Sequence, residues 1–186
     1  MAAHEKADLE VVIPGSKANA WSFIVFLVAL VISGGPFAAI YGFGVLKQGF
    51  VSFLTDYVGL ALTLLVGTLL HEFLHALGFS LAADRGWSSI HFGFSWKDFA
   101  PFTYCDDVVS YSGFATATLL PGILLGILPL IISMINGNSW ILSFGVFFTA
   151  GAAGDFLCII NLLKYPTHFR VKDHSDSIGF ILMEQK

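Results

Sequence analysis

The pentad His71-Glu72-Phe73-Leu74-His75 contains the residue types that can bind a metal ion and activate water. Residues four apart lie on one face of a helix, so His71 and His75 can offer two imidazoles to one ion. Glu72 lies beside this pair, where its carboxylate can act as a general base on a water molecule. The spacing therefore predicts a hydrolytic metal site, with Glu72 as the catalytic residue and both histidines as metal ligands.

The pentad lies within an apolar stretch, residues 57–83, which is long enough to cross a bilayer. A bare H-E-x-x-H motif occurs by chance in many soluble helices. Within a membrane, ionisable side chains are costly unless they pair or bind an ion, so they indicate a functional site. The combination predicts hydrolysis inside a membrane.

Composition agrees with a lipid environment. Of the 186 residues, 56% are hydrophobic and 12% are charged, whereas a soluble domain has roughly 25% charged residues. The chain has no Lys/Arg cluster, so nucleic acid is not an expected partner. The two cysteines, Cys105 in a polar loop and Cys158 in an apolar stretch, are expected to be free thiols. Nothing in the composition sets the oligomeric state.

Four apolar stretches are long enough to span a bilayer at about 20 residues each: residues 21–46, 57–83, 111–135 and 140–163. The first is interrupted at residues 33–36 and is too short for two full spans, so we expect one bent helix. Pro121 and Pro129 in the third stretch are tolerable within a membrane helix. The predicted fold is an all-α membrane protein with about four transmembrane helices.

The remaining segments are expected to flank one core. Residues 1–20 are an N-terminal tail, residues 21–165 the membrane-embedded core, and residues 166–186 a polar C-terminal tail. The aromatic-rich residues 86–96 alternate apolar and polar side chains, which predicts a short β-hairpin at the membrane interface. This hairpin is either an interfacial anchor or an edge strand that pairs with an extended substrate.

The distribution of charge predicts the topology. With four crossings and a cytoplasmic N-terminus, the outer segments contain only Lys47. The inner segments then contain every other basic residue: Lys6, Lys17, Arg85, Lys97, Lys164, Arg170, Lys172 and Lys186. This asymmetry favours a multi-pass protein of the cell membrane with both termini in the cytoplasm.

Asp155 is the predicted third metal ligand. His75 lies ten residues before Arg85 and Asp155 nine before Lys164, so at about 1.5 Å per residue both lie roughly 14 Å from the inner surface. Two histidines and one carboxylate, with a fourth position open, are the ligands of catalytic zinc. Two alternatives remain: Asp155 only forms a hydrogen bond, or the loop residues at positions 106 and 107, both aspartates, supply the ligand.

The pentad, Gly154-Asp155 and residues 171–180 resemble the small bacterial membrane proteins grouped as "putative zincin peptidases". More distantly, the pentad and Asp155 resemble the site-2 intramembrane metalloproteases, although Phe156 stands where that family has a glycine after the aspartate. The resemblance implies a zinc peptidase that cleaves a membrane protein or peptide substrate. Asn161, on the same helix as Asp155, either orients the substrate backbone or bonds a carbonyl between helices.

Two other classes of function fit parts of this pattern. A membrane metal transporter or carrier would bind an ion in transit through the same ligands, but it has no need of Glu72. A non-catalytic scaffold with a structural zinc site also needs no base. Because Glu72 follows His71 directly, we expect a zinc metalloendopeptidase.

Overall fold

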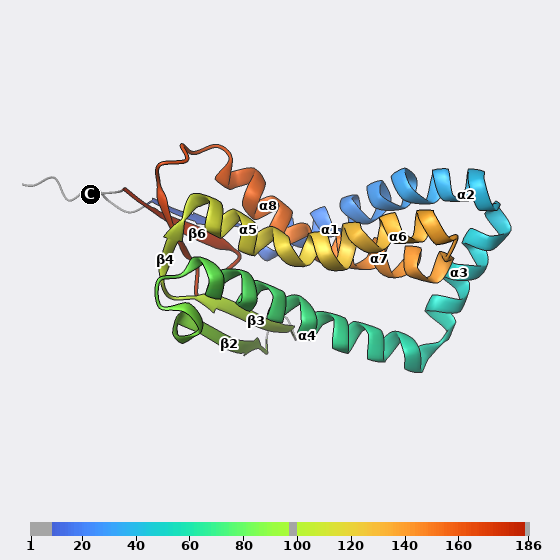
Figure 1. Cartoon of the computed structure of the whole chain (residues 1–186), viewed down its shortest axis with the longest axis horizontal. Coiled ribbons are helices and arrows are strands. Elements are labelled where there is room, and N and C mark those ends of the chain that lie inside the picture. The colour runs from blue at the N-terminus through green and yellow to red at the C-terminus, as the bar shows by residue number, and fades with distance from the viewer. Residues whose placement is uncertain (1–8, 97–99, 185–186) are drawn as a thin grey trace, which may run out of the picture.

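The computed structural model of the protein describes residues 9–96 and 100–184. Long helices lie side by side in an elongated bundle, and two small β-sheets cover one end of it (Figure 1). The predicted helical class with small β-structure is therefore confirmed. Lys6, Lys97 and Lys186, which entered the charge count, lie outside the described residues, as do parts of both predicted tails.

The first apolar helix comprises α1 (Gly15–Ala29), the π-helical segment η1 (Leu30–Gly34) and α2 (Gly35–Tyr41). Pro36 has no N–H for the helical ladder, which explains irregular hydrogen bonding just before it. The helix ends at Gly42, whose φ of 93° favours glycine. The sequence prediction of one bent helix over residues 21–46 was wrong in its bounds, because Leu46 belongs to a separate helix, α3 (Phe43–Thr55).

Three further apolar segments match their predicted positions closely. Helix α4 (Tyr57–Ala82) begins after Asp56, whose carboxylate accepts the N–H of Gly59. The next segment consists of α5 (Tyr111–Pro121), η3 (Gly122–Ile127) and α6 (Leu128–Asn136). The last is bent by 47° between α7 (Ser139–Gly151) and α8 (Ala153–Leu162). By length and composition, three helices can cross a membrane, or four if the bent pair is one span.

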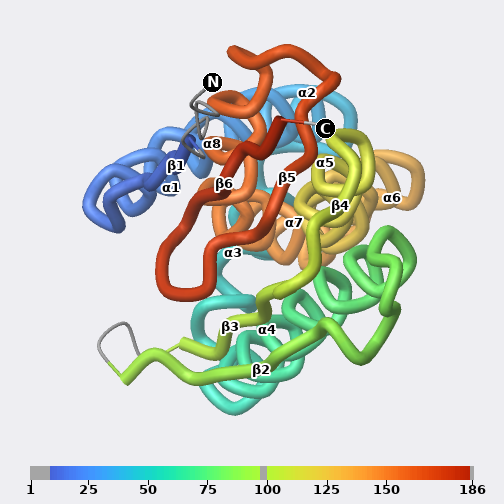
Figure 2. The backbone as a smooth tube through the Cα atoms, turned by 90° about the vertical axis from the view of Figure 1, so that its left-hand side faces the viewer, coloured from blue at the N-terminus to red at the C-terminus, as the bar shows by residue number. Residues whose placement is uncertain are grey.

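The segments predicted as tails contribute to a four-stranded antiparallel sheet with the order β1-β6-β5-β4. Its strands are β1 (Leu9–Val12), β4 (Val108–Ser110), β5 (Arg170–Asp173) and β6 (Gly179–Met183). Figure 2 shows β1, β6, β5 and β4 side by side at the end of the bundle. The β1–β6 pairing places the first and last described segments at the same end of the helices.

A second sheet pairs β2 (Ile90–Ser95) with β3 (Ala100–Cys105). It follows a short 3-10 helix, η2 (Gly86–Ser89). The β-hairpin that the sequence predicts within residues 86–96 was therefore placed wrongly. Residues 90–95 form only the first strand of this hairpin. Its second strand is β3, where aromatic residues again alternate with other residues after Pro101.

The largest core cluster joins the helices to the four-stranded sheet. Phe79 of α4 packs on Phe114 of α5, and Phe114 packs in turn on Phe180 of β6. A Cβ atom on Gly78 would lie only 2.6 Å from Cα of Ala117, so α4 and α5 touch backbone to backbone. The N-terminal half of α4 is largely exposed (Leu65 59%, Leu69 54%), and its apolar surface is compatible with a membrane protein.

Candidate metal centre

Helix α4 presents both histidines toward α5 and α8. The close approach of α4 to α5 at Gly78 brings Nδ1 of His75 to 3.1 Å from the carbonyl oxygen of Ala117. With Nδ1 donating to this carbonyl, the free lone pair lies on Nε2. A backbone carbonyl that fixes the tautomer in this way is the usual support of a metal-binding histidine. The neighbouring helix α5 therefore holds the His75 ring in an orientation that leaves Nε2 free to bind a metal ion.

Asp155 reaches the histidines because the last apolar segment bends. Ala152 interrupts the helix, so Asp155 lies in the first turn of α8, where the helix dipole favours a carboxylate. Its Oδ2 lies 3.2 Å from Nε2 of His71, and its Oδ1 lies 3.4 Å from Nε2 of His75. The two histidine Nε2 atoms are themselves 3.2 Å apart. The structure thus brings together the three residues predicted as ligands.

The donor set fits a zinc ion. Two ligand atoms that are each about 2.0–2.1 Å from zinc at a tetrahedral angle are about 3.3 Å apart. The two Nε2 atoms are 3.2 Å apart, and different oxygens of Asp155 lie 3.2 and 3.4 Å from them. With one ligand atom from each residue, all three atoms lie within 4.8 Å of one another. Oδ2 of Asp155 is buried without a hydrogen-bond partner among the described residues. An ion between the three side chains would satisfy this orphaned oxygen. The group His71, His75 and Asp155 has the chemistry and the spacing of a metal-binding site.

Glu72 lies next to the group and is partly exposed. Strand β3 packs along α4 at this point, and the Thr103 hydroxyl donates to the backbone carbonyl of Glu72 over 3.1 Å. This hydrogen bond places strand β3 directly beside Glu72. This position suits a base that acts on water beside the metal.

The other residues considered from sequence lie apart from this group. Asn161 donates to the carbonyl of Leu157 and accepts from Lys164, so its amide is bound within its own helical turn. Its predicted role in substrate binding is untested and stays a prediction.

The two loop aspartates pair with Arg85, and Asp106 also with His91. The hydrogen bond from His91 and the Arg85 guanidinium lower the pKa of Asp106. The pKa of Asp107 is also lowered, mainly by the hydrogen bond that its carboxylate accepts from the backbone N–H of Arg85. Neither carboxylate belongs to the metal-binding group that the described residues form.

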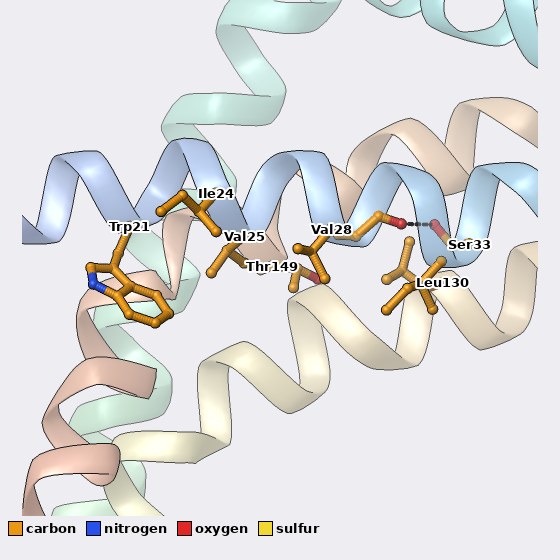
Figure 3. A pocket seen from close by; sticks show the side chains of 9 residues that line it. Trp21, Ile24, Val25, Val28, Ser33, Leu130 and Thr149 are labelled. Atoms are coloured by element: carbon orange, nitrogen blue, oxygen red, sulfur yellow. Dashed lines mark hydrogen bonds between the residues drawn. The ribbon is translucent and has the colours of Figure 1, made fainter.

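An apolar groove of about 310 Å³ runs along α1 (Figure 3). It lies between α1, α6 and α7, and its only polar side chains are those of Ser33 and Thr149, apart from the Trp21 indole N–H. Ser33 already donates to the carbonyl of Ala29. Among the described residues, no acidic, basic or histidine side chain lines this groove.

Three supporting groups were not among the predicted site residues: the Ala117 carbonyl, Thr103 and Asp173. A carbonyl carries no side-chain signal, and Thr103 acts through a pairing that no local pattern reveals. Asp173 lies in the segment that carried the family resemblance, which was the available signal. Both oxygens of Asp173 accept backbone N–H groups, those of Cys105 and His174, each over 3.1 Å.

The fold and the site define an apolar helical protein with a two-histidine, one-carboxylate metal-binding group beside a glutamate. The chain belongs to the family described as "putative zincin peptidase", which matches residues 64–169. Membership indicates a metallopeptidase and implies zinc. The match includes α4 from Leu64, strands β2 to β4 and Asp155, while β5 and β6 follow it. No curated protein and no solved structure matches the chain significantly.

Proposed function

We propose that the protein is a zinc-dependent endopeptidase that cleaves membrane protein substrates within or next to the bilayer. The observation that carries this proposal is the convergence of His71, His75 and Asp155, whose ligand atoms lie within 4.8 Å of one another. Family membership and the apolar helices around the group support it. The proposed setting is the cell membrane, with both termini in the cytoplasm.

Each residue of the group has a defined part in the proposed reaction. His71, His75 and Asp155 would hold the zinc ion, which supplies a Lewis acid that activates water and polarises a peptide carbonyl. Glu72 accepts the proton of the attacking water and then donates it to the leaving amine. The Ala117 carbonyl keeps His75 in the tautomer that leaves Nε2 free.

A membrane-spanning substrate hides its carbonyls in helical hydrogen bonds, so it must unwind before cleavage. An unwound strand needs partners for its freed backbone groups, and the edge of a β-strand provides them. Strand β3 lies against Glu72 through Thr103. We assign to β3 the binding of the extended substrate next to the catalytic group.

The test replaces Glu72 with glutamine, which keeps the shape of the side chain and removes its basic site. Purified Glu72→Gln should keep about one zinc per chain and lose about 10²- to 10⁴-fold in cleavage rate, the usual contribution of a general base. Zinc is measured by elemental analysis, and cleavage is followed with fluorescein-labelled casein in detergent.

The matched control is Asp84→Asn, which neutralises an exposed carboxylate away from the metal-binding group. Zinc content and cleavage should both match wild type in this variant. Wild-type cleavage by Glu72→Gln would refute the proposed mechanism.

A further inference from the structure

The edge of β3 that faces away from β2 offers few free backbone N–H groups. In an antiparallel pair, the N–H and C=O of successive residues point alternately toward and away from the partner strand. Asp106, which follows β3, donates its N–H to Ser89 on the β2 side. Cys105 instead donates its N–H to Oδ2 of Asp173, away from β2. The groups of residues 101, 103 and 105 therefore face the free edge.

Of these three residues, only one retains an available donor. Residue 101 is proline and has no N–H, and the N–H of Cys105 is bound by Asp173. Thr103 is partly exposed, and in the described part of the chain its N–H has no backbone partner outside the β2 pairing. Its hydroxyl bonds the carbonyl of Glu72, so the single free donor lies beside the proposed base.

Asp173 also belongs to the wall opposite this edge. It ends β5. The β5–β6 turn lies beside Gly154, the residue before Asp155, because a Cβ atom on Gly154 would lie 3.5 Å from Cδ1 of Ile178. A cleft of about 340 Å³ between Tyr104 of β3 and Lys172 of β5 adjoins Asp173. The Asp173 carboxylate thus connects β5 to β3 beside the cleft in which we expect an extended substrate to lie.

We propose that Asp173 is a positioning residue that holds β3 through the Cys105 N–H and leaves Thr103 as the single backbone donor for an extended substrate. This inference rests on the proposed peptidase function and adds the contact that sets the substrate strand next to Glu72. The proposal also gives the β5–β6 hairpin a role in the site, although this hairpin lies after the residues that match the family.

The first test reads the position of β3 without any enzyme assay. The chain has two cysteines, so Cys158→Ala leaves Cys105, which is fully buried, as the only thiol. Adding Asp173→Ala should release β3 and raise the rate of Cys105 alkylation by N-ethylmaleimide about tenfold. Asp176→Ala is the matched control, because its carboxylate accepts only from the neighbouring Ser175 hydroxyl among the described residues, and the rate should stay unchanged.

The second test separates substrate binding from chemistry with fluorescein-labelled casein. Thr103→Pro removes the free N–H at an edge position that tolerates proline, whereas Thr103→Val keeps it. Asp173→Ala and Thr103→Pro should raise KM about tenfold, the effect of one lost hydrogen bond, with kcat and zinc content near wild type. Thr103→Val should raise KM less than Thr103→Pro.

Unchanged alkylation of Cys105 in Asp173→Ala overturns the proposal, and so does a KM equal to wild type in both Asp173→Ala and Thr103→Pro. An equal fall in kcat and zinc content would mean that Asp173 only supports the fold, which also overturns it. Asp173→Asn keeps one acceptor oxygen and should restore much of the protection of Cys105. The peptidase function is tested separately by Glu72→Gln. Cleavage at the wild-type rate in that variant would refute the function without bearing on the contact between Asp173 and Cys105.

Discussion

Asp155 carries the only negative charge in the proposed ligand set. If it binds zinc, Asp155→Ala leaves two neutral imidazoles, and zinc affinity should fall at least about tenfold with loss of cleavage. If it only accepts hydrogen bonds, Asp155→Asn should retain near-normal zinc, because the amide can accept and donate. Elemental analysis of the two variants distinguishes these cases. Full zinc occupancy in Asp155→Ala would contradict the ligand assignment.

Asp173 makes the fold sensitive to pH. Burial raises the pKa of its carboxyl to about 7, against the opposing effects of the Cys105 N–H, His75 and His174. The folded protein therefore holds this proton up to about pH 7, while the unfolded chain releases it near pH 4. The associated stability is present below pH 4 and is lost as the pH rises through 7.

Asp173→Asn cannot ionise, so its unfolding temperature relative to wild type should rise by a few degrees between pH 4.5 and pH 8. The measurement is thermal unfolding in detergent with a metal chelator, which removes the contribution of zinc. A difference between the two proteins that stays constant across this pH range would show that Asp173 does not titrate there. His174→Gln, compared in the same way, reports the contribution of the neighbouring imidazole.

At the scale of elements, the contact between α4 and α5 determines how His75 is presented. A methyl group on Gly78 would meet the backbone of Ala117 at 2.6 Å, so Gly78→Ala must separate the helices. Overpacking of this kind costs about 1–3 kcal/mol, and the Nδ1 bond of His75 should weaken with it. We expect a lower unfolding temperature and weaker zinc binding. Gly44→Ala is the control, because nothing lies within 4 Å of its Cβ position.

The sequence predicted the elements whose signals are local. Runs of apolar residues locate α4 and the 111–136 helix to within a residue or two, and the four-residue spacing of His71 and His75 defines one helix face. Depth along two helices was enough to associate Asp155 with the histidines. Strand pairing, in contrast, depends on distant partners: nothing near Leu9 indicates that it lies opposite Leu182. The bend at Ala152 was missed because alanine and glycine occur equally in straight membrane helices.

At the scale of the whole molecule, the predicted topology assigns the sheets to the cytoplasm and α3 to the outer surface. In a variant without Cys105 and Cys158, cysteine at Gln48 of α3 should react with an impermeant maleimide in intact cells. Cysteine at Asp84, beside the sheets, should react only after the membrane is opened. The reverse pattern would place the sheets outside the cell and contradict the proposed cytoplasmic location of both termini.

The β1–β6 pairing also bears on the biogenesis of the protein. Strand β1 precedes all the helices and β6 follows them, so the ribosome releases β1 long before its partner exists. The sheet can close only after the last helix has been synthesised, at the entropic cost of a very long loop. Asp173, which ends β5, is likewise synthesised only after the last helix. If the proposed peptidase function and the proposed role of Asp173 both hold, a nascent chain would stay inactive during translation and insertion and gain activity only once the sheet has closed.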